Sequence, residues 1–284
     1  TDAVTTIIAG TEKPALMSGV ETLTVNSTEA DTAASIDLAN VTGLTSVVTS
    51  FTNASNDDQI SLLNLASGVK VKTTVTQTQD QLVIGLTDVA SETNSLDLEL
   101  TSFATVAADV LDLNAAGVET LNLTNKSALA GVVDLAGVDA TSATGFVTVN
   151  VAGTGATTLN ALNTDINVVN ASAATGSLTL AAAQRDTDVM TVTGGYAGDA
   201  ITMENVADVM DGGAGVDTLS INFAAILGGL SVDLSSTTDQ VTAMDGGSNA
   251  AVQKNFESVD ASLFTGFGAV IKGSSAANTI DWPS

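Results

Sequence analysis

Three consecutive blocks of nine residues carry aspartates at one repeated position. The blocks cover residues 194–202, 203–211 and 212–220 and read GGYAGDAIT, MENVADVMD and GGAGVDTLS. In each block the sixth residue is an aspartate (Asp199, Asp208 or Asp217), and an apolar residue follows two positions later. Glycines that make a tight turn, a carboxylate that ligates Ca²⁺ and an apolar residue that enters the core are the features of a nonapeptide β-roll. One coil cannot complete such a site, so the spacing predicts calcium ions held between stacked coils.

The predicted metal site combines carboxylates with backbone carbonyl groups of the turns. Its predicted ligands are Asp199, Asp208, Asp217, Asp211, Gly194, Tyr196, Gly212 and Ala214. Ca²⁺ prefers oxygen ligands of this kind, and it is the one cofactor that we predict. The alternative is a set of ordinary β-turns with solvated aspartates. Three blocks in one register favour the calcium site over that alternative.

The third block resembles the repeat of the RTX family of calcium-dependent secreted bacterial proteins, which reads G-G-x-G-x-D-x-U-x with U apolar. The matching residues are Gly212, Gly213, Gly215, Asp217 and Leu219. The first block departs from the repeat at Ala197, and the middle block contains no glycine. Residues with a Cβ atom resist positive φ, so we expect a different turn in the middle block. A degenerate further copy at 273–281 carries Asn278 at the aspartate position.

The composition fits an extracellular protein whose charge is balanced by metal ions. Thirty-two acidic residues face seven basic ones, which gives a net charge of −25 and strong self-repulsion unless counter-ions intervene. The scarcity of lysine and arginine argues against nucleic acid as a partner. Hydrophobic residues make up 44% of the chain, enough to build a core, so disorder is the weaker interpretation. There is no cysteine for disulfides, and no apolar run approaches the roughly 20 residues of a membrane span.

Short alternation of apolar and polar residues dominates the rest of the chain. Period-two runs, for example at 36–38, 96–100, 121–123 and 147–151, predict strands of a few residues. A unit that reads GVETL at 19–23 recurs at 117–121, and more weakly as NFESV at 255–259. Repeated units bury their apolar faces by stacking on one another. We therefore predict an all-β fold, a parallel β-solenoid of the β-helix or β-roll type with calcium-binding turns, and a β-sandwich insertion is the competing explanation for part of the chain.

Two regions are expected within this solenoid. Residues 1–185 form a β-solenoid region rich in Thr, Ala and Asn, and residues 186–284 form the calcium-binding β-roll with a C-terminal β region. We interpret the last residues as the edge of a fragment or a capping end. Family members usually carry an export signal at the extreme C-terminus, and that signal is not found here. Phe223, Phe256, Phe264 and Phe267 are expected to pack in the core or cap an end, with ligand binding as the alternative.

The mixture of GVETL units, the phrase FESVDAS at 256–262 and GSSAANTI at 273–280 resembles the lattice-forming region of RTX-type bacterial surface-layer proteins. The resemblance implies a protein that is exported by type I secretion and that folds and self-assembles on the cell surface when it meets Ca²⁺. The expected partners are other copies of the chain and, through regions outside this sequence, lipopolysaccharide or another surface glycan. The alternative is a segment of a large secreted RTX adhesin that binds a glycan or another surface.

An enzymatic role is not expected. The chain has no histidine, which removes Ser-His-Asp catalysis and zinc sites of the His-ligated type. Paired carboxylates for glycoside chemistry would need aromatic and basic partners that are scarce in this chain. We expect surface carboxylates instead to bridge neighbouring copies through Ca²⁺, with a solvated charge as the alternative for each. The candidates are Asp31, Asp57, Asp58, Asp80, Asp134, Asp139 and Asp245.

Overall fold

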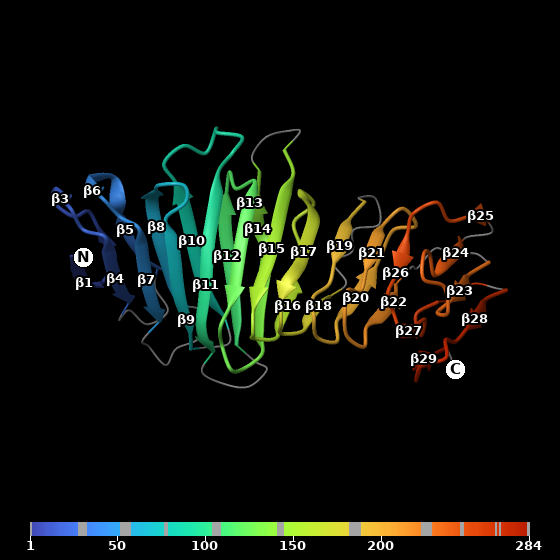
Figure 1. Ribbon diagram of the computed structural model, residues 1–284. Coiled ribbons are helices and arrows are strands. Elements are labelled where there is room, and N and C mark those ends of the chain that lie inside the picture. Colours follow the sequence, from blue (N-terminus) through green and yellow to red (C-terminus); the bar gives the residue numbers. More distant parts are fainter. Residues whose placement is uncertain are drawn as a thin grey trace. The chain divides into compact units, whose positions relative to one another are not determined.

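The computed structural model describes residues 2–27, 33–51, 58–76, 79–103, 109–140, 145–181, 189–222, 229–244, 247–264, 266 and 268–282. Within these residues the protein is all-β, and its one helical element is a single 3₁₀ turn, η1 (Leu38–Asn40). The chain divides into two compact units, Thr1–Ile166 and Asn167–Ser284. Each unit is built from parallel stacked strands (Figure 1), so the predicted β-solenoid is confirmed. The predicted boundary at 185/186 lies outside the described residues.

In the first unit each coil contributes one strand to each of two parallel sheets. Sheet 1 contains, in order, β1 (Ala3–Ile8), β4 (Thr22–Ser27), β7 (Ser46–Phe51), β9 (Lys70–Val75), β11 (Ser95–Phe103), β13 (Thr120–Asn125) and β15 (Val147–Gly153). Sheet 2 contains β2 (Thr11–Glu12), β5 (Ala33–Asp37), β8 (Gln59–Leu65), β10 (Asp80–Leu86), β12 (Val110–Ala116), β14 (Gly131–Asp139) and β16 (Thr157–Asn160). A short pair, β3 (Met17–Ser18) and β6 (Val41–Thr42), lies outside both sheets.

The core of the first unit consists of ladders of like residues. In sheet 1 one ladder runs through Leu23, Val47, Val71, Leu98, Leu123 and Val151. Each of these side chains is at most 2% exposed. The residues between them along each strand point to the outer face, because successive side chains of a strand alternate in direction. Each leucine or valine side chain that is fully buried stabilises the folded state by about 1.5–3 kcal/mol. The period-two pattern of such residues therefore dictates the fold.

The second unit repeats this arrangement with shorter strands. Sheet 3 contains β17 (Ile166–Ala174), β19 (Thr191–Thr193), β21 (Val209–Asp211) and β26 (Gln253–Lys254). Sheet 4 contains β18 (Leu178–Leu180), β20 (Ala200–Met203), β22 (Thr218–Ile221), β27 (Ser258–Asp260) and β29 (Ile280–Asp281). Apolar residues of the nonapeptide blocks enter this core, as predicted, since Ile201, Met210 and Leu219 are fully buried.

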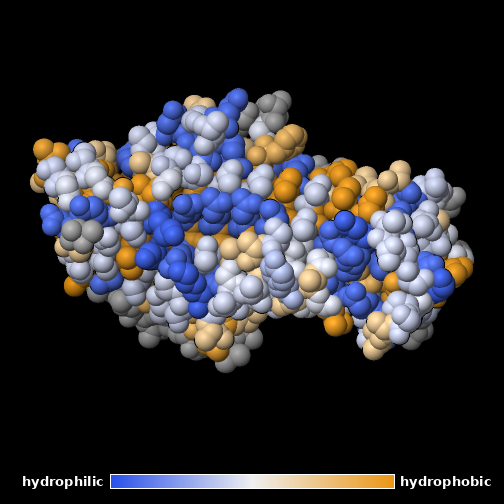
Figure 2. All heavy atoms as spheres, viewed as in Figure 1, coloured by the Kyte–Doolittle hydropathy of each residue, from blue (hydrophilic) through white to orange (hydrophobic). Residues whose placement is uncertain are grey.

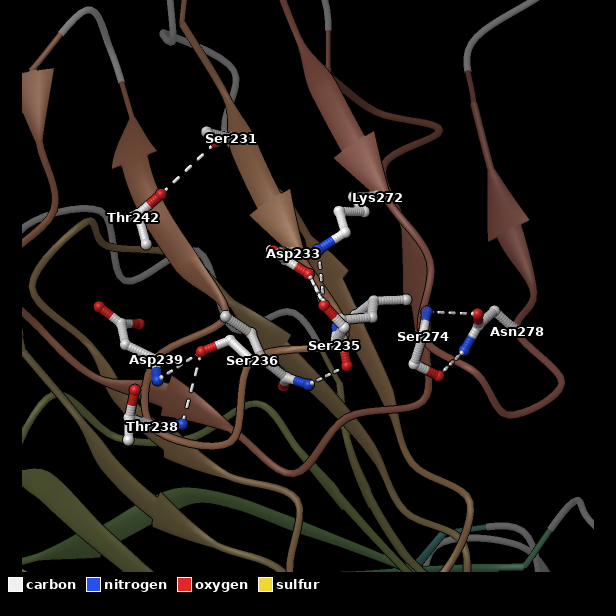
Figure 3. Close-up of polar contacts among 12 residues, drawn as sticks. Ser231, Asp233, Ser235, Ser236, Thr238, Asp239, Thr242, Lys272, Ser274 and Asn278 are labelled. Atoms are coloured by element: carbon white, nitrogen blue, oxygen red, sulfur yellow. Dashed lines mark hydrogen bonds and ion pairs between the residues drawn. The ribbon is translucent and has the colours of Figure 1, made fainter.

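Three strands inserted between β22 and β26, together with one strand that follows β27, form a separate sheet of mixed pairing rather than a further coil. This sheet 5 contains β25 (Gly247–Ser248), β24 (Val241–Met244), β23 (Ser231–Asp233) and β28 (Val270–Lys272). The pairs β23–β24 and β24–β25 are antiparallel, whereas β23–β28 is parallel. Lys272 joins β28 to β23, because its Nζ lies 2.8 Å from an Oδ2 of Asp233 and 2.8 Å from Oγ of Ser235 (Figure 3).

The three copies of the GVETL unit adopt one conformation at the start of a strand. The first residue has a positive φ in every copy: 73° at Gly19, 73° at Gly117 and 60° at Asn255. Asparagine tolerates this left-handed conformation better than most residues with a Cβ atom, which explains its place in the third copy. The residue after it is buried in each case. The weak similarity of NFESV to GVETL is therefore a true structural equivalence.

The glutamate of each unit binds the backbone of the coil before it. Glu21 accepts a hydrogen bond from the backbone N–H of Asp2. Glu119 accepts one from Asn94 at 2.7 Å, and Glu257 accepts one from Asp217 at 2.9 Å. Each carboxylate thus accepts a hydrogen bond from a backbone N–H group at the point where a coil enters a sheet. Side-chain oxygens cap the first N–H groups of helices in the same way.

Several local predictions have different outcomes. The strand expected at 36–38 ends at Asp37, because its Oδ1 accepts from the N–H of Ala39 and starts η1. Asp58 and Asp80 were expected on the surface, and this is wrong: they are 1% and 0% exposed, since both lie at the inward position where a strand of sheet 2 begins. Asp31, Asp57 and Asp245 lie outside the described residues.

The phenylalanine prediction holds where the structure describes it. Phe256 and Phe264 are buried, and Phe264 packs against Trp282 with ring centroids 5.7 Å apart. Phe223 and Phe267 lie outside the described residues. No helix among the described residues has the length and apolar character needed to cross a membrane.

Candidate metal centre

Two nonapeptides make one coil, so the three predicted aspartates fall on two different edges. The chain passes from β19 through a turn at 194–199 into β20, then through a turn at 204–208 into β21, and through a third turn at 212–217 into β22. The first and third turns both lead from sheet 3 to sheet 4, whereas the second leads back from sheet 4 to sheet 3. Asp199 and Asp217 therefore stack in successive coils, and Asp208 lies at the other edge.

Asp199 and Asp217 form a buried column along the shared edge. They are 2% and 1% exposed. Oδ1 of Asp217 accepts from the backbone N–H of Asp199 at 2.7 Å, and Oδ1 of Asp199 accepts from Leu178 at 2.7 Å. Glu257 continues the column by accepting from the N–H of Asp217 at 2.9 Å. Each carboxylate in the column thus holds the backbone of the preceding coil in place.

One oxygen of this column is left over. Oδ2 of Asp199 accepts from the N–H of Gly195 at 2.6 Å. Oδ2 of Asp217 is buried and has no hydrogen-bond partner among the described residues. A buried carboxylate oxygen without a partner is costly, so it calls for a proton or a cation. Oδ2 of Asp217 is therefore the atom of the column that most clearly calls for a proton or a cation.

The electrostatics of the column point in the same direction. Burial raises the pKa of Asp199 above its ordinary value. Burial, and after it the charges of Asp199, Glu257 and Asp211, raises the pKa of Asp217 to about 7. Within the part of the chain that the structure describes, no lysine or arginine is among the causes that act on the pKa of Asp217. Near neutral pH Asp217 therefore resists ionisation unless a positive charge accompanies it.

The glycines of the motif allow carbonyl oxygens to crowd against the carboxylates. A Cβ on Gly194 would lie 2.0 Å from the carbonyl oxygen of Gly212 and 2.5 Å from Oδ2 of Asp199. One coil later, a Cβ on Gly212 would lie 2.1 Å from the carbonyl oxygen of Asn255 and 3.0 Å from Oδ2 of Asp217. The same pairing of one carbonyl with one carboxylate recurs in both coils. Only a residue without a side chain fits between them.

Positive φ is needed at two further glycines of the third block. Gly213 has φ 91° and Gly215 has φ 146°, and a Cβ on either would also meet a carbonyl oxygen of the coil before. The middle block, which lacks glycine, turns without any residue of positive φ at 203–208. The turn at 194–199 in the first block also has no residue of positive φ, so among the three turns only the third uses this conformation.

Asp208 occupies a comparable but separate environment at the opposite edge. It is 2% exposed, and its Oδ1 accepts from the N–H of Met190 at 2.8 Å. Its Oδ2 accepts from the backbone N–H of Glu204 at 3.1 Å and from that of Asn205 at 2.9 Å. Burial raises the pKa of Asp208. Both oxygens are already hydrogen-bonded, so Asp208 closes its own turn and lies apart from the column of Asp199 and Asp217.

The remaining predicted ligands divide in the same way. Gly194 and Gly212, like Tyr196 and Ala214, are 18 residues apart and occupy equivalent turn positions in successive coils. The side chain of Tyr196 is exposed, while its N–H donates to the carbonyl of Ala174 at 3.0 Å. The N–H of Ala214 donates to the carbonyl of Gly195 at 2.9 Å. These residues shape the turns through their backbones, and their role as Ca²⁺ ligands stays a prediction.

Asp211 already has a cation from the protein. Its Oδ2 lies 3.1 Å from Nζ of Lys254, and its Oδ1 accepts from Nδ2 of Asn255 at 2.7 Å. Burial alone raises the pKa of this carboxyl, but the hydrogen bonds from Asn255, Lys254 and the N–H of Gly213 outweigh it and lower the pKa. Asp211 and Asp217 therefore differ in their electrostatics: among the described residues Asp211 has a cationic partner, Lys254, and Asp217 has none.

Sequence reasoning missed two members of this edge. Asn255 contributes a carbonyl beside Gly212, and Glu257 extends the carboxylate column. Both belong to the NFESV copy, so its alignment with GVETL was the signal that could have identified them. An insertion separates both residues from Asp217 along the chain, so the sequence does not indicate that they lie close to it.

The degenerate copy carries a neutral amide in place of the carboxylate. Oδ1 of Asn278 accepts from the N–H of Ser274 at 2.8 Å, the bond that Asp199 makes with Gly195 in its own turn (Figure 3). Its Nδ2 donates to the carbonyl of Glu257 at 2.7 Å. A neutral amide at this position satisfies the neighbouring oxygens itself, whereas a carboxylate cannot donate.

The donor set fits a hard cation better than a soft one. Among the described residues no three His, Cys, Asp or Glu side chains gather in a way that could hold a metal ion. A site at this edge therefore depends on two carboxylates supplemented by turn carbonyls, all of them oxygen ligands of the type that Ca²⁺ accepts in flexible geometry. Comparison of the chain with protein-family models, curated proteins and solved structures finds no match.

Proposed function

We propose that the protein is a structural component of a bacterial surface layer that folds on binding Ca²⁺ after secretion and self-assembles into a two-dimensional lattice. The observation that carries the proposal is the buried column of Asp199 and Asp217, with an unpartnered oxygen and a pKa of about 7 at Asp217. A chain with net charge −25 that also buries carboxylates without cations is suited to a compartment rich in divalent ions.

Asp199 and Asp217, together with the carbonyl groups of Gly212 and Asn255, are the residues that would hold the ion. When bound, Ca²⁺ would supply the positive charge that the column lacks. The chain's own part is to keep these oxygens in successive coils, through the hydrogen bonds from Asp199 to Asp217 and from Asp217 to Glu257. Binding energy from such a preassembled edge becomes folding energy of the coils that form it.

The rest of the architecture suits a scaffold rather than a catalyst. The outer faces of the sheets carry rows of Thr, Asn and Asp at the same position of successive strands. Such rows offer extended surfaces for contacts between copies. A non-catalytic role also agrees with the complete lack of histidine and cysteine in the chain.

A calcium titration of the full chain tests the proposal. We expect circular dichroism to report a gain of β-structure as Ca²⁺ is added to protein kept in chelator, arising from the second unit. Light scattering and electron microscopy should then show growing sheets. A chain that is fully folded in excess chelator contradicts the calcium-coupled fold.

The same titration separates the surface-layer role from that of an adhesin segment. A calcium-saturated chain that stays monomeric at every concentration and instead binds a glycan array would favour the adhesin. Ordered sheets without glycan binding would favour the surface layer.

A further inference from the structure

The outer face of sheet 1 gathers most of the cations that the first unit possesses. Lys70 and Lys72 project outward from β9, and Lys126 follows β13. Between them Glu99 lies on β11, with its Oε2 2.9 Å from Nζ of Lys126 and 4.0 Å from Nζ of Lys70. Three of the seven basic residues of the chain thus surround one carboxylate. We call Lys70, Lys72 and Lys126 around Glu99 the lysine face.

The lysine face keeps a positive balance in a strongly negative protein. Asp97 lies in register with Lys70, so three positive and two negative side chains meet there. Asp97 is engaged by Nδ2 of Asn122 at 2.7 Å, and Asn122 in turn by Asn150 at 2.9 Å. Figure 2 shows strongly hydrophilic residues gathered in a band across the middle of the first unit. The ammonium groups of Lys70 and Lys126 remain accessible, with side chains 47% and 59% exposed.

The outer face of sheet 2 carries the opposite charge. Asp112 and Asp134 lie side by side on β12 and β14, in register. They line a shallow hollow of about 460 Å³ together with Gln79, Gln81, Val110 and Asn160, and none of these lining residues is basic. Burial, and also the charge of Asp112, raises the pKa of Asp134. We call this feature the aspartate hollow.

The two features cannot meet within one molecule. The inward side chains of sheet 1 and sheet 2 pack together as the core of the unit, so the outer faces of the two sheets point away from each other. Complementary charges on opposite faces favour contact between one copy and the next. A contact between two different faces is heterologous, and a heterologous contact that does not close into a ring produces an open array.

We propose that the lysine face of one copy docks on the aspartate hollow of a second copy, so that the chains associate face to back. The inference rests on the proposed self-assembly and identifies one contact that produces it. The second copy is favoured over an anionic polymer because the chain itself presents a hollow of complementary charge, lined by Asp112 and Asp134. Complementary charges of this kind fix the register of an interface and exclude wrong pairings.

Charge reversal with rescue tests the contact in the full chain. One variant carries K70E and K72E, so both of its faces are acidic; the other carries D112K and D134K, so both of its faces are basic. In CaCl₂, sedimentation and light scattering should show that each variant alone needs at least a tenfold higher concentration to assemble than the wild type. An equal mixture of the two variants should assemble again, as should a chain with all four substitutions. Added NaCl should raise the wild-type threshold, because exposed charges are screened beyond about 10 Å at 0.1 M salt.

The controls separate this interface from the proposed function and from misfolding. Circular dichroism must show the wild-type calcium response in each variant, and K70Q with K72Q gives a milder version in case the reversed charges disturb Glu99. Assembly of K70E/K72E at the wild-type threshold, or failure of the mixture to assemble, overturns the interface while leaving calcium-dependent self-assembly intact. Normal assembly combined with lost binding of dextran sulfate would assign the lysine face to an anionic polymer and also overturn it. A wild-type chain that never assembles overturns the proposed function itself.

Discussion

Replacing Asp217 by asparagine should stabilise the calcium-free protein and weaken its response to calcium. The pKa of Asp217 is raised from 3.8 to about 7 in the folded chain. A carboxyl group with a raised folded pKa binds its proton more tightly in the folded than in the unfolded state, so it favours folding only while protonated. In chelator, the contribution of Asp217 to wild-type stability should be most favourable below about pH 3.8, fall as the pH rises toward about 7, and stay low above that.

The magnitude follows from this difference in pKa. Fully expressed, it corresponds to about 4 kcal/mol at pH 8, and screening by water at the edge of a narrow coil lowers our expectation to about 2 kcal/mol. The D217N variant has no titrating group at this position. Urea unfolding in EDTA should therefore show equal stabilities near pH 4 and a more stable variant at pH 8. The neutral Asn278, whose amide is fully hydrogen-bonded in the equivalent turn, shows that the fold accepts this substitution.

Calcium should reverse the order of the two proteins. The wild type should gain stability on adding Ca²⁺, while D217N should gain less and show a higher calcium midpoint, because a buried oxygen ligand is lost. D211N is the matched control. It removes the ion pair with Lys254 and a charge near Asp217 but no oxygen of the column, so it should cost about 1 kcal/mol in EDTA at pH 8 and move the calcium midpoint much less than D217N does. Equal or lower stability of D217N in EDTA at pH 8, or an unchanged calcium midpoint, refutes the role given to Asp217.

Three further substitutions test how the coils are joined. Gly212→Ala should destabilise the second unit by about 2 kcal/mol or more in thermal melts, because its Cβ would lie 2.1 Å from the carbonyl oxygen of Asn255. Gly85→Ala is the control and should be neutral, because the nearest atom to its Cβ is 3.5 Å away. Equal melting temperatures of the two variants would contradict the steric crowding at Gly212. Glu119→Ala should cost about 1 kcal/mol in urea by leaving the N–H of Asn94 without its acceptor, while Glu119→Gln should lose less, and identical losses would show that the acceptor is unimportant. Leu121→Ala should cost about 3 kcal/mol by opening a cavity between Leu96 and Val149, its buried neighbours in sheet 1; a cost below about 1 kcal/mol would mean that the core repacks freely.

Much of the fold could be predicted because its signals are local. The period-two runs at 96–100, 121–123 and 147–151 became β11, β13 and β15, since alternation along a strand directly sorts side chains between core and surface. The recurrence of the GVETL unit predicted stacked coils. In the structure the copies share a positive φ, a buried residue and a glutamate at fixed positions. Asp58 and Asp80 were misjudged because charge alone suggests exposure, whereas their place at the inward start of a strand decides burial.

The amino-acid sequence on its own determined the nonapeptide register, the inward apolar residues and the turn glycines, because each depends on residues within a few positions of one another. It did not determine which aspartates meet. That depends on two nonapeptides closing one coil, which brings Asp199 beneath Asp217 and sends Asp208 to the opposite edge. Nor did it reveal that Glu257 contacts Asp217, because 40 positions separate them along the chain. Neighbours in a parallel stack are chosen by the length of each coil and by interstrand register, and only the folded chain shows both.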